Sequence, residues 1–119
     1  MRQTFSALAA TAQLVRTGRT LLRSVRIRQK TGAAPELYIQ FFNNAAPTVG
    51  TTAPNMVIPV PAGAAGEIKL DNIDFQGIYG GRDFGTALSI ACTTVHDGAV
   101  APTAGDEPVV DVDYNAVGA

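Results

Sequence analysis

Hydrophobic and polar residues alternate along most of this chain, as they do in β-strands that bury one face. In the segment ELYIQFFN, Leu37, Ile39 and Phe41 point to one side while Glu36 and Gln40 point to the other. The preceding segment LLRSVRIRQ alternates in the same way, and the turn residues KTGAAP lie between the two. The pattern predicts a β-hairpin made of these two segments, from which the rest of a sheet would grow.

One position interrupts the alternation within residues 20–29. The residues on the apolar face there are Leu21, Val25 and Ile27. Arg23 falls on that face, so the strand either lies at a sheet edge, where an inward charge blocks further pairing, or carries a bulge. A bulge at Arg23 and Ser24 would shift the register and turn Leu22 inward as well.

Further strands are expected at 13–16 and in four segments, PNMVIPVPAGA, GEIKLDN, TALSIACTT and VVDVDYN. Pro59 and Pro61 lack amide donors, which places the first of the four at a sheet edge. The loop NNAAPTVGTTAP before it is expected to cross from one sheet to another. In TALSIACTT, short side chains alternate with Leu88, Ile90 and Cys92, which predicts an outer face that is close-packed or covered by another subunit.

Two other segments complete the pattern. The glycine-rich segment IDFQGIYGGRDFG is expected to bend so that Phe75, Ile78 and Phe84 plug one end of the core. Residues 1–11 lack a convincing helix cap and are expected to form an N-terminal arm. We therefore predict an all-β protein, with a single-domain β-sandwich or jelly roll of about seven or eight strands over residues 12–119.

Charge is distributed unevenly along the 119 residues, although the net charge is only −1. Seven of the nine cations precede the first acid, Glu36. They are Arg2, Arg16, Arg19, Arg23, Arg26, Arg28 and Lys30. A basic first quarter can indicate nucleic-acid binding. Because no aromatic residues interleave with the arginines, we favour basic strands that lie beside acidic ones such as Asp111 and Asp113, within one subunit or between neighbours.

The sequence shows no catalytic or metal-binding motif. The single Cys92 cannot form an internal disulfide, and the single His96 follows it at a spacing typical of no nucleophile–base pair and of no zinc site. Two acidic groups could in principle collect a hard cation. They are Asp71, Asp74 and Asp83, and Asp106, Glu107, Asp111 and Asp113. Neither has a calcium-loop spacing, so we expect no metal, no cofactor and no enzyme activity.

No hydrophobic run approaches the roughly 18 residues that span a bilayer. The opening MRQTFSALAATAQ is too short and too often interrupted by Ser and Thr for a secretory signal. The sequence therefore predicts a soluble protein with no membrane partner.

The order of these segments over residues 12–114 resembles small structural proteins of tailed bacteriophages. The matching positions are Tyr38, Gln40 and Phe42, then Ile58 to Gly63, then Gly77, Ile78, Gly85 and Leu88. The resemblance implies a virion component, assembled in the host cytoplasm. Its implied role is that of a decoration or cement protein on the capsid surface, where it would bind the major capsid protein and copies of itself as a dimer or trimer.

On that interpretation, the arm and one arginine face would contact the shell. The expected contact residues are Phe5, Leu8, Arg23, Arg26 and Arg28. The loop 95–108 would then face outward or toward a sister copy. Three alternatives stay open: a tail, neck or fibre-attachment subunit, a carbohydrate-binding sandwich, and a binder of single-stranded nucleic acid. The absence of Trp disfavours the second, and we expect no specific nucleic acid as a partner.

Overall fold

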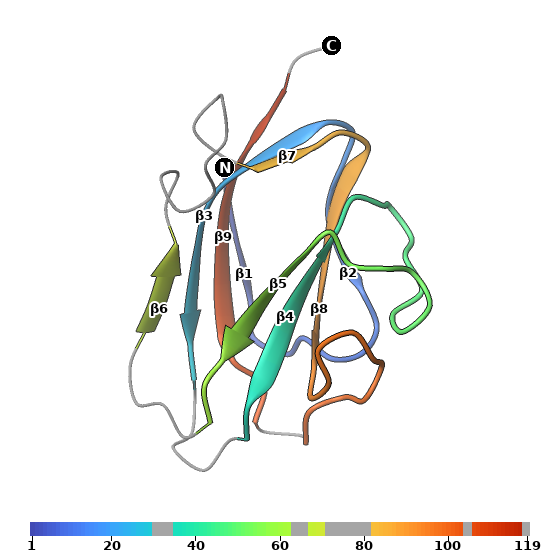
Figure 1. Ribbon diagram of the computed structural model, residues 1–119. Coiled ribbons are helices and arrows are strands. Elements are labelled where there is room, and N and C mark those ends of the chain that lie inside the picture. The colour runs from blue at the N-terminus through green and yellow to red at the C-terminus, as the bar shows by residue number, and fades with distance from the viewer. Residues whose placement is uncertain (30–34, 63–66, 71–81, 104–105, 118–119) are drawn as a thin grey trace.

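The alternating segments form two antiparallel sheets packed face to face, which confirms the predicted all-β sandwich (Figure 1). The computed structural model describes residues 1–29, 35–62, 67–70, 82–103 and 106–117. Within this part of the chain there are nine strands and no helix. The strands are β1 (Arg2–Phe5), β2 (Gln13–Thr17), β3 (Thr20–Arg28), β4 (Leu37–Phe42), β5 (Met56–Val60), β6 (Glu67–Leu70), β7 (Arg82–Phe84), β8 (Ala87–Thr93) and β9 (Val109–Ala116).

Sheet A has the strand order β1-β9-β3-β6, and β7 pairs with the first part of β3. Sheet B has the order β2-β8-β4-β5. The apolar side chains of both sheets meet between them and form one core. Its fully buried members include Ile27 on β3, Phe41 on β4, Ile90 on β8 and Val112 on β9. Phe84 also belongs to this core, as expected, whereas Phe75 and Ile78 lie outside the described residues.

The β3 strand contains the bulge that was one of the two alternatives for Arg23. The pairing of β3 with β9 shifts register between Leu22 and Ser24. Leu22 and Val25 are both buried in the core, and Arg23 and Ser24 between them are only half-buried. The extra residue lets two polar side chains in a row avoid the core without breaking the strand.

The predicted hairpin and the predicted crossover are both wrong. β3 lies in sheet A and β4 in sheet B, so the two segments face each other across the core and do not pair. β4 pairs with β5 and β8, so the loop 43–55 joins two neighbouring strands of one sheet. The edge position of β5 is confirmed, with the exposed Pro59 opposite Tyr38.

The N-terminal residues belong to the sandwich and are not a separate arm. β1 pairs with β9 at the edge of sheet A, with Arg2 opposite Asp113 and Phe5 opposite Val110. Leu8 is 1% exposed and lies in the core. The Ala9 carbonyl accepts a hydrogen bond of 3.0 Å from the Cys92 amide. The alternation in RQTF is therefore a strand signal, and its shortness concealed it.

A folded two-stranded ribbon links the two sheets. The chain passes from sheet B to sheet A between β2 and β3, and it returns between β7 and β8. The two passages run side by side, because Thr17 pairs with Ala87 in sheet B and Thr20 pairs with Phe84 in sheet A. Between these pairs, the Gly18 amide donates to the Thr86 carbonyl at 2.9 Å. Pairing thus continues through the bend.

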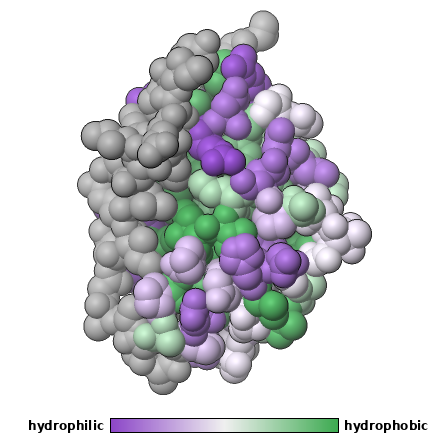
Figure 2. All heavy atoms as spheres, viewed as in Figure 1, coloured by the Kyte–Doolittle hydropathy of each residue, from purple (hydrophilic) through white to green (hydrophobic). Residues whose placement is uncertain are grey.

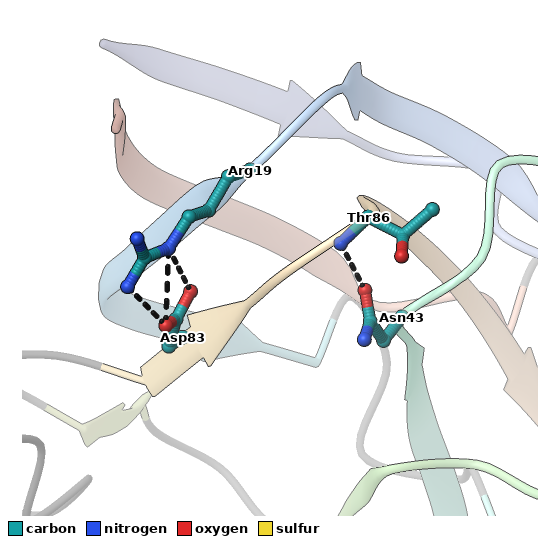
Figure 3. A network of polar contacts seen from close by, with 4 residues as sticks. All are labelled: Arg19, Asn43, Asp83 and Thr86. Carbon is teal, nitrogen blue, oxygen red and sulfur yellow. Dashed lines mark hydrogen bonds and ion pairs between the residues drawn. The ribbon is translucent and has the colours of Figure 1, made fainter. Parts of the chain in front are cut away.

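Polar side chains hold this bend in place (Figure 3). Arg19 on one passage binds Asp83 on the other, with Nη2 2.8 Å from Oδ2 and Nε 3.2 Å from both carboxylate oxygens. Asn43, which follows β4, accepts a hydrogen bond from the Thr86 amide at 2.7 Å through Oδ1. The bend is therefore tied to itself and to the end of a central strand of sheet B.

Replacing Gly18 by alanine should destabilise the protein by about 1–2 kcal/mol, because Gly18 has a φ of 94°, which costs other residues that much. Gly85 on the other passage is the matched control, since a Cβ there comes no closer than 4.0 Å to Asn43 Nδ2. Urea unfolding measures the loss of stability in Gly18→Ala and in Gly85→Ala. Equal losses in the two variants would contradict the role assigned to the Gly18 conformation.

The Arg19 guanidinium lowers the pKa of Asp83, chiefly through their hydrogen bonds. At a pH above about 4, the ordinary pKa of an Asp carboxyl, the lowered pKa of Asp83 stabilises the fold. This contribution is lost as the pH falls through the lowered pKa. Because both side chains are largely exposed, Asp83→Asn should cost less than about 1 kcal/mol at pH 7. Unfolding midpoints should converge for wild type and variant at low pH or in 1 M salt. A difference that persists there would contradict an electrostatic origin.

Candidate functional site

The outer side of sheet A carries a row of charged and polar side chains from three neighbouring strands. We call this surface the charged face. Its members are Arg2 and Thr4 on β1, Ser24, Arg26 and Arg28 on β3, and Asp111 and Asp113 on β9. The alternation that buries Val110 and Val112 in the core turns the two aspartates outward. All seven side chains are half-buried or exposed.

The register places opposite charges beside each other on this face. The acidic strand β9 lies between the two basic strands, so that Asp113 is opposite Arg2 and Asp111 is opposite Arg26. Thr4 Oγ1 donates to Asp111 Oδ1 at 2.5 Å. These pairings confirm the prediction that basic strands lie beside acidic ones, and here they do so within one subunit.

A small depression lies at the centre of the charged face. Its volume is about 10 Å³, enough for roughly one water molecule. It is lined by both arginine–aspartate pairs, Arg2 with Asp113 and Arg26 with Asp111.

Of the residues expected to contact a partner, the structure brings only the arginines toward this face. Arg26 is half-buried and Arg28 is exposed at the end of β3. Arg23 sits at the bulge, where Nη1 donates at 3.1 Å to the Asn115 side-chain oxygen when that amide is turned toward it. Phe5 packs against the core and Leu8 lies inside it, so these two do not join the surface. The arm expectation had placed them outside because it missed β1.

The outer side of sheet B is partly covered by the chain's own loops. Every residue of β8 is buried, including Ser89, Ala91 and Thr93 on the outer side. Ser89 Oγ donates to the Asn44 carbonyl at 2.6 Å, and Thr93 Oγ1 donates to the Val95 carbonyl at 2.6 Å. The close-packed outer face predicted from the short side chains is therefore confirmed, and loops 43–55 and 94–103 contribute to its cover.

The two covering loops leave a groove of about 510 Å³ between them. It is lined by residues 50–57 and by His96 and Asp97. The His96 ring meets the Tyr38 ring edge-on, with centroids 5.6 Å apart. On the side of the molecule viewed in Figure 2, small hydrophobic areas near the centre and at the lower right lie among hydrophilic residues. Among the described residues that line the groove, no cysteine or serine accompanies the histidine to form a nucleophile–base pair.

The one thiol is chemically inert in the folded protein. Cys92 is buried in the core, and burial raises the pKa of its thiol to about 12, with the charge of Glu107 adding to the effect. A buried thiol with a raised pKa stays protonated at neutral pH, which disfavours reaction as a nucleophile.

Metal-binding side chains do not cluster in the described part of the chain: no three His, Cys, Asp or Glu residues come together there. Asp111 and Asp113 share a face, as expected, and have cationic or hydroxyl neighbours. Asp71 and Asp74 lie outside the described residues. The same part of the chain contains no helix long and apolar enough to cross a membrane.

Comparison with models of known protein families, with curated proteins and with solved structures gives no match to this chain.

Sequence reasoning missed Arg2 and Thr4, which complete the charged face. The available signal was the alternation Arg-Gln-Thr-Phe, which repeats the strand pattern seen later in the chain. It also missed the burial of Gln40, which looked like a water-facing residue of β4. Only the packing of loop 94–100 over that strand accounts for it.

The buried thiol predicts a specific loss of stability at alkaline pH. Because the folded pKa of Cys92 is raised, unfolding releases its proton once the pH exceeds the unfolded pKa of about 8.5, and stability falls by up to about 1.4 kcal/mol per pH unit until about pH 12. Cys92→Ala removes this term. The free energies of unfolding of wild type and Cys92→Ala should therefore converge or cross between pH 7 and 10.5. Parallel pH profiles would contradict the raised pKa.

Proposed function

We propose that this chain is a structural, protein-binding subunit of a tailed-phage virion, and specifically a decoration protein that binds and stabilises the capsid shell. The observation that carries the proposal is the charged face. This face presents cations on β1 and β3 and anions on β9 between them. Pairing of β9 with both neighbours fixes the backbone of these strands. Such a surface complements another protein with its own pattern of charges.

The charge pattern disfavours a nucleic-acid partner. Binding to a phosphate backbone needs a continuous cationic surface, and here two aspartates lie between the arginines of β1 and β3. The carbohydrate interpretation has equally little support, because the described residues that line the groove between loops 43–55 and 94–103 include no Trp, Tyr or Phe. Protein binding is the class that uses both signs of charge.

The proposed partner is the major capsid protein, with copies of this chain as additional neighbours at the symmetric positions of a shell. Mechanically, each copy would bridge adjacent capsid subunits and add buried contact area that resists internal DNA pressure. The virion and capsid assignment rests on the sequence resemblance to small phage structural proteins, and the charged face supports binding to another protein.

The test is co-sedimentation of the purified chain with expanded capsid shells that were assembled without it. Arg28→Glu reverses an exposed charge at the end of β3, and we expect it to reduce co-sedimentation with shells at least tenfold. Arg82→Glu is the matched control. Arg82 Nη2 binds the Asn55 carbonyl beside sheet B at 2.9 Å, so this side chain points away from the charged face. The control should bind shells as the wild type does.

A charge swap separates binding from folding. Arg26→Asp combined with Asp111→Arg keeps an opposite pair within the chain but inverts the pattern shown to a partner. We expect this variant to unfold at nearly the wild-type urea concentration and to lose shell binding. Normal binding by the swap and by Arg28→Glu would contradict the proposal. Rings or tubes without shell binding would indicate a tail or neck subunit, and steeply salt-dependent DNA binding would indicate a nucleic-acid role.

A further inference from the structure

Strand β1 forms one end of sheet A. It pairs with β9 on one side, and within the described part of the chain no strand pairs with its other side. Other edges of the sandwich carry features that discourage further pairing, because β5 contains the exposed Pro59 and β2 shifts register between Leu14 and Arg16. The pairing of β1 is regular, and the strand contains no proline. This edge is therefore suited to pairing with another strand.

The ladder between β1 and β9 determines which backbone groups face the open edge. The Tyr114 amide donates to the Met1 carbonyl at 2.8 Å. Hydrogen-bonded and non-hydrogen-bonded pairs alternate along an antiparallel ladder, so Gln3 also bonds β9, whereas the backbone groups of Arg2 and Thr4 point away from it. Two N–H donors and two C=O acceptors therefore line the open edge.

A second copy of β1 can supply the complementary groups. In an antiparallel pair of β1 strands, Arg2 of each copy lies opposite Thr4 of the other, and the two Gln3 residues lie opposite each other. This register satisfies the ladder with four backbone hydrogen bonds and relates the copies by a two-fold axis at Gln3. The neighbouring registers set Arg2 against Arg2 or Thr4 against Thr4, and each keeps only half of these bonds within β1.

The side chains also suit this register. On the charged face, Arg2 would lie opposite the uncharged Thr4 of the other copy, with Asp113 of its own chain on the other side. On the inner side, Phe5 would lie opposite Met1 of the other copy. Phe5 is half-buried and Met1 is 58% exposed. Contact between them would remove apolar surface from water that the single chain leaves exposed.

We propose that two copies of this chain associate through their β1 edges as a two-fold symmetric dimer. Sheet A then continues across both copies in the order β6-β3-β9-β1-β1-β9-β3-β6, and the two charged faces lie on the same side of this sheet. Because the dimer occupies the free edge of each β1, association stops at two copies. The dimer is a property of the free chain and is independent of the proposed function.

The size of this contact sets the expected affinity. At about one hydrogen bond per 100–200 Å² of interface, four bonds correspond to roughly 400–800 Å². Stable complexes bury at least about 1,200 Å², so the dimer should be weak, with a dissociation constant on the order of 10⁻⁴ M.

Sedimentation equilibrium of the full chain, from about 10 µM to about 1 mM, tests the proposal. The average mass should rise from that of one chain toward that of two and no further. A mass that stays at one chain would overturn the proposal and leave this edge to a strand from another protein. Growth to a trimer or to larger assemblies would also overturn it, because the two-fold contact leaves no free β1 edge.

A proline on β1 tests whether the dimer uses this edge. Thr4→Pro removes an N–H that faces the open edge and leaves the N–H groups that face β9 in place. Each copy thereby loses one of the four bonds between copies, so the dissociation constant should rise at least tenfold. A dimer of unchanged affinity in a folded Thr4→Pro variant would contradict the proposal.

Disulfide trapping tests the register. In the proposed dimer the two Gln3 residues form a non-hydrogen-bonded pair with Cα atoms about 4.5 Å apart, which a disulfide can span. In a glutathione redox buffer, Gln3→Cys should cross-link between copies at least tenfold faster than the control Leu14→Cys, which places the thiol at an exposed position on β2. The native Cys92 is buried and does not compete. Equal rates for the two variants would contradict the register.

A measurement on the wild-type chain covers the case in which a variant fails to fold. In ¹H–¹⁵N spectra, the backbone amide signals of Arg2, Gln3 and Thr4 should shift as the protein concentration rises. The amide of Val57 on the β5 edge should stay in place. Fixed β1 signals while the mass doubles would place the contact elsewhere and overturn the proposal.

Discussion

The fold depends on the two-stranded ribbon that bends from one sheet into the other. β2 and β3 form one of its chains and β7 and β8 form the other, with pairing preserved through Gly18 and Thr86. Because this ribbon belongs to both sheets, it joins them directly, and Phe84 on β7 is buried in the core between them. Strands β9 and β4 then add to β3 and β8 respectively, which places them on opposite sides of the core.

This arrangement also determines what each sheet shows to its surroundings. β9 inserts between β1 and β3, so aspartates from the end of the chain come to lie between arginines from its beginning. On sheet B, the loop 43–55 between β4 and β5 and residues 94–103 after β8 fold back and help to bury the outer side, including Gln40 and Thr93. The sandwich therefore has one face that its own loops help to cover and one face with mixed charge, and this difference is why we place the partner on sheet A.

Local features of this fold were predictable from the sequence, and its strand partners were not. Period-two alternation locates most strands, and Pro59 identifies an edge. Arg23 indicates either an edge or a bulge, and the register shift in the structure decides for the bulge. Alternation does not say which strands pair, so the segments on either side of KTGAAP resembled a hairpin although they lie in opposite sheets. The four residues of β1 were too few to establish a period. Likewise, Arg26 and Arg28 were identified and Asp111 and Asp113 were named as acidic neighbours, but the place of Arg2 and Thr4 beside them depends on long-range register.

The central claim, that the charged face of sheet A meets the partner, is tested most directly by carboxylate footprinting. A carbodiimide label would be applied to the free protein and to the protein bound to undecorated shells, with modification at each acid read by mass spectrometry. The account predicts that binding protects Asp111 and Asp113, while Asp83 at the bend and Asp97 on the loop over sheet B stay equally reactive. Protection of Asp97 with no change at Asp111 and Asp113 would contradict it and would place the contact on the loops of sheet B.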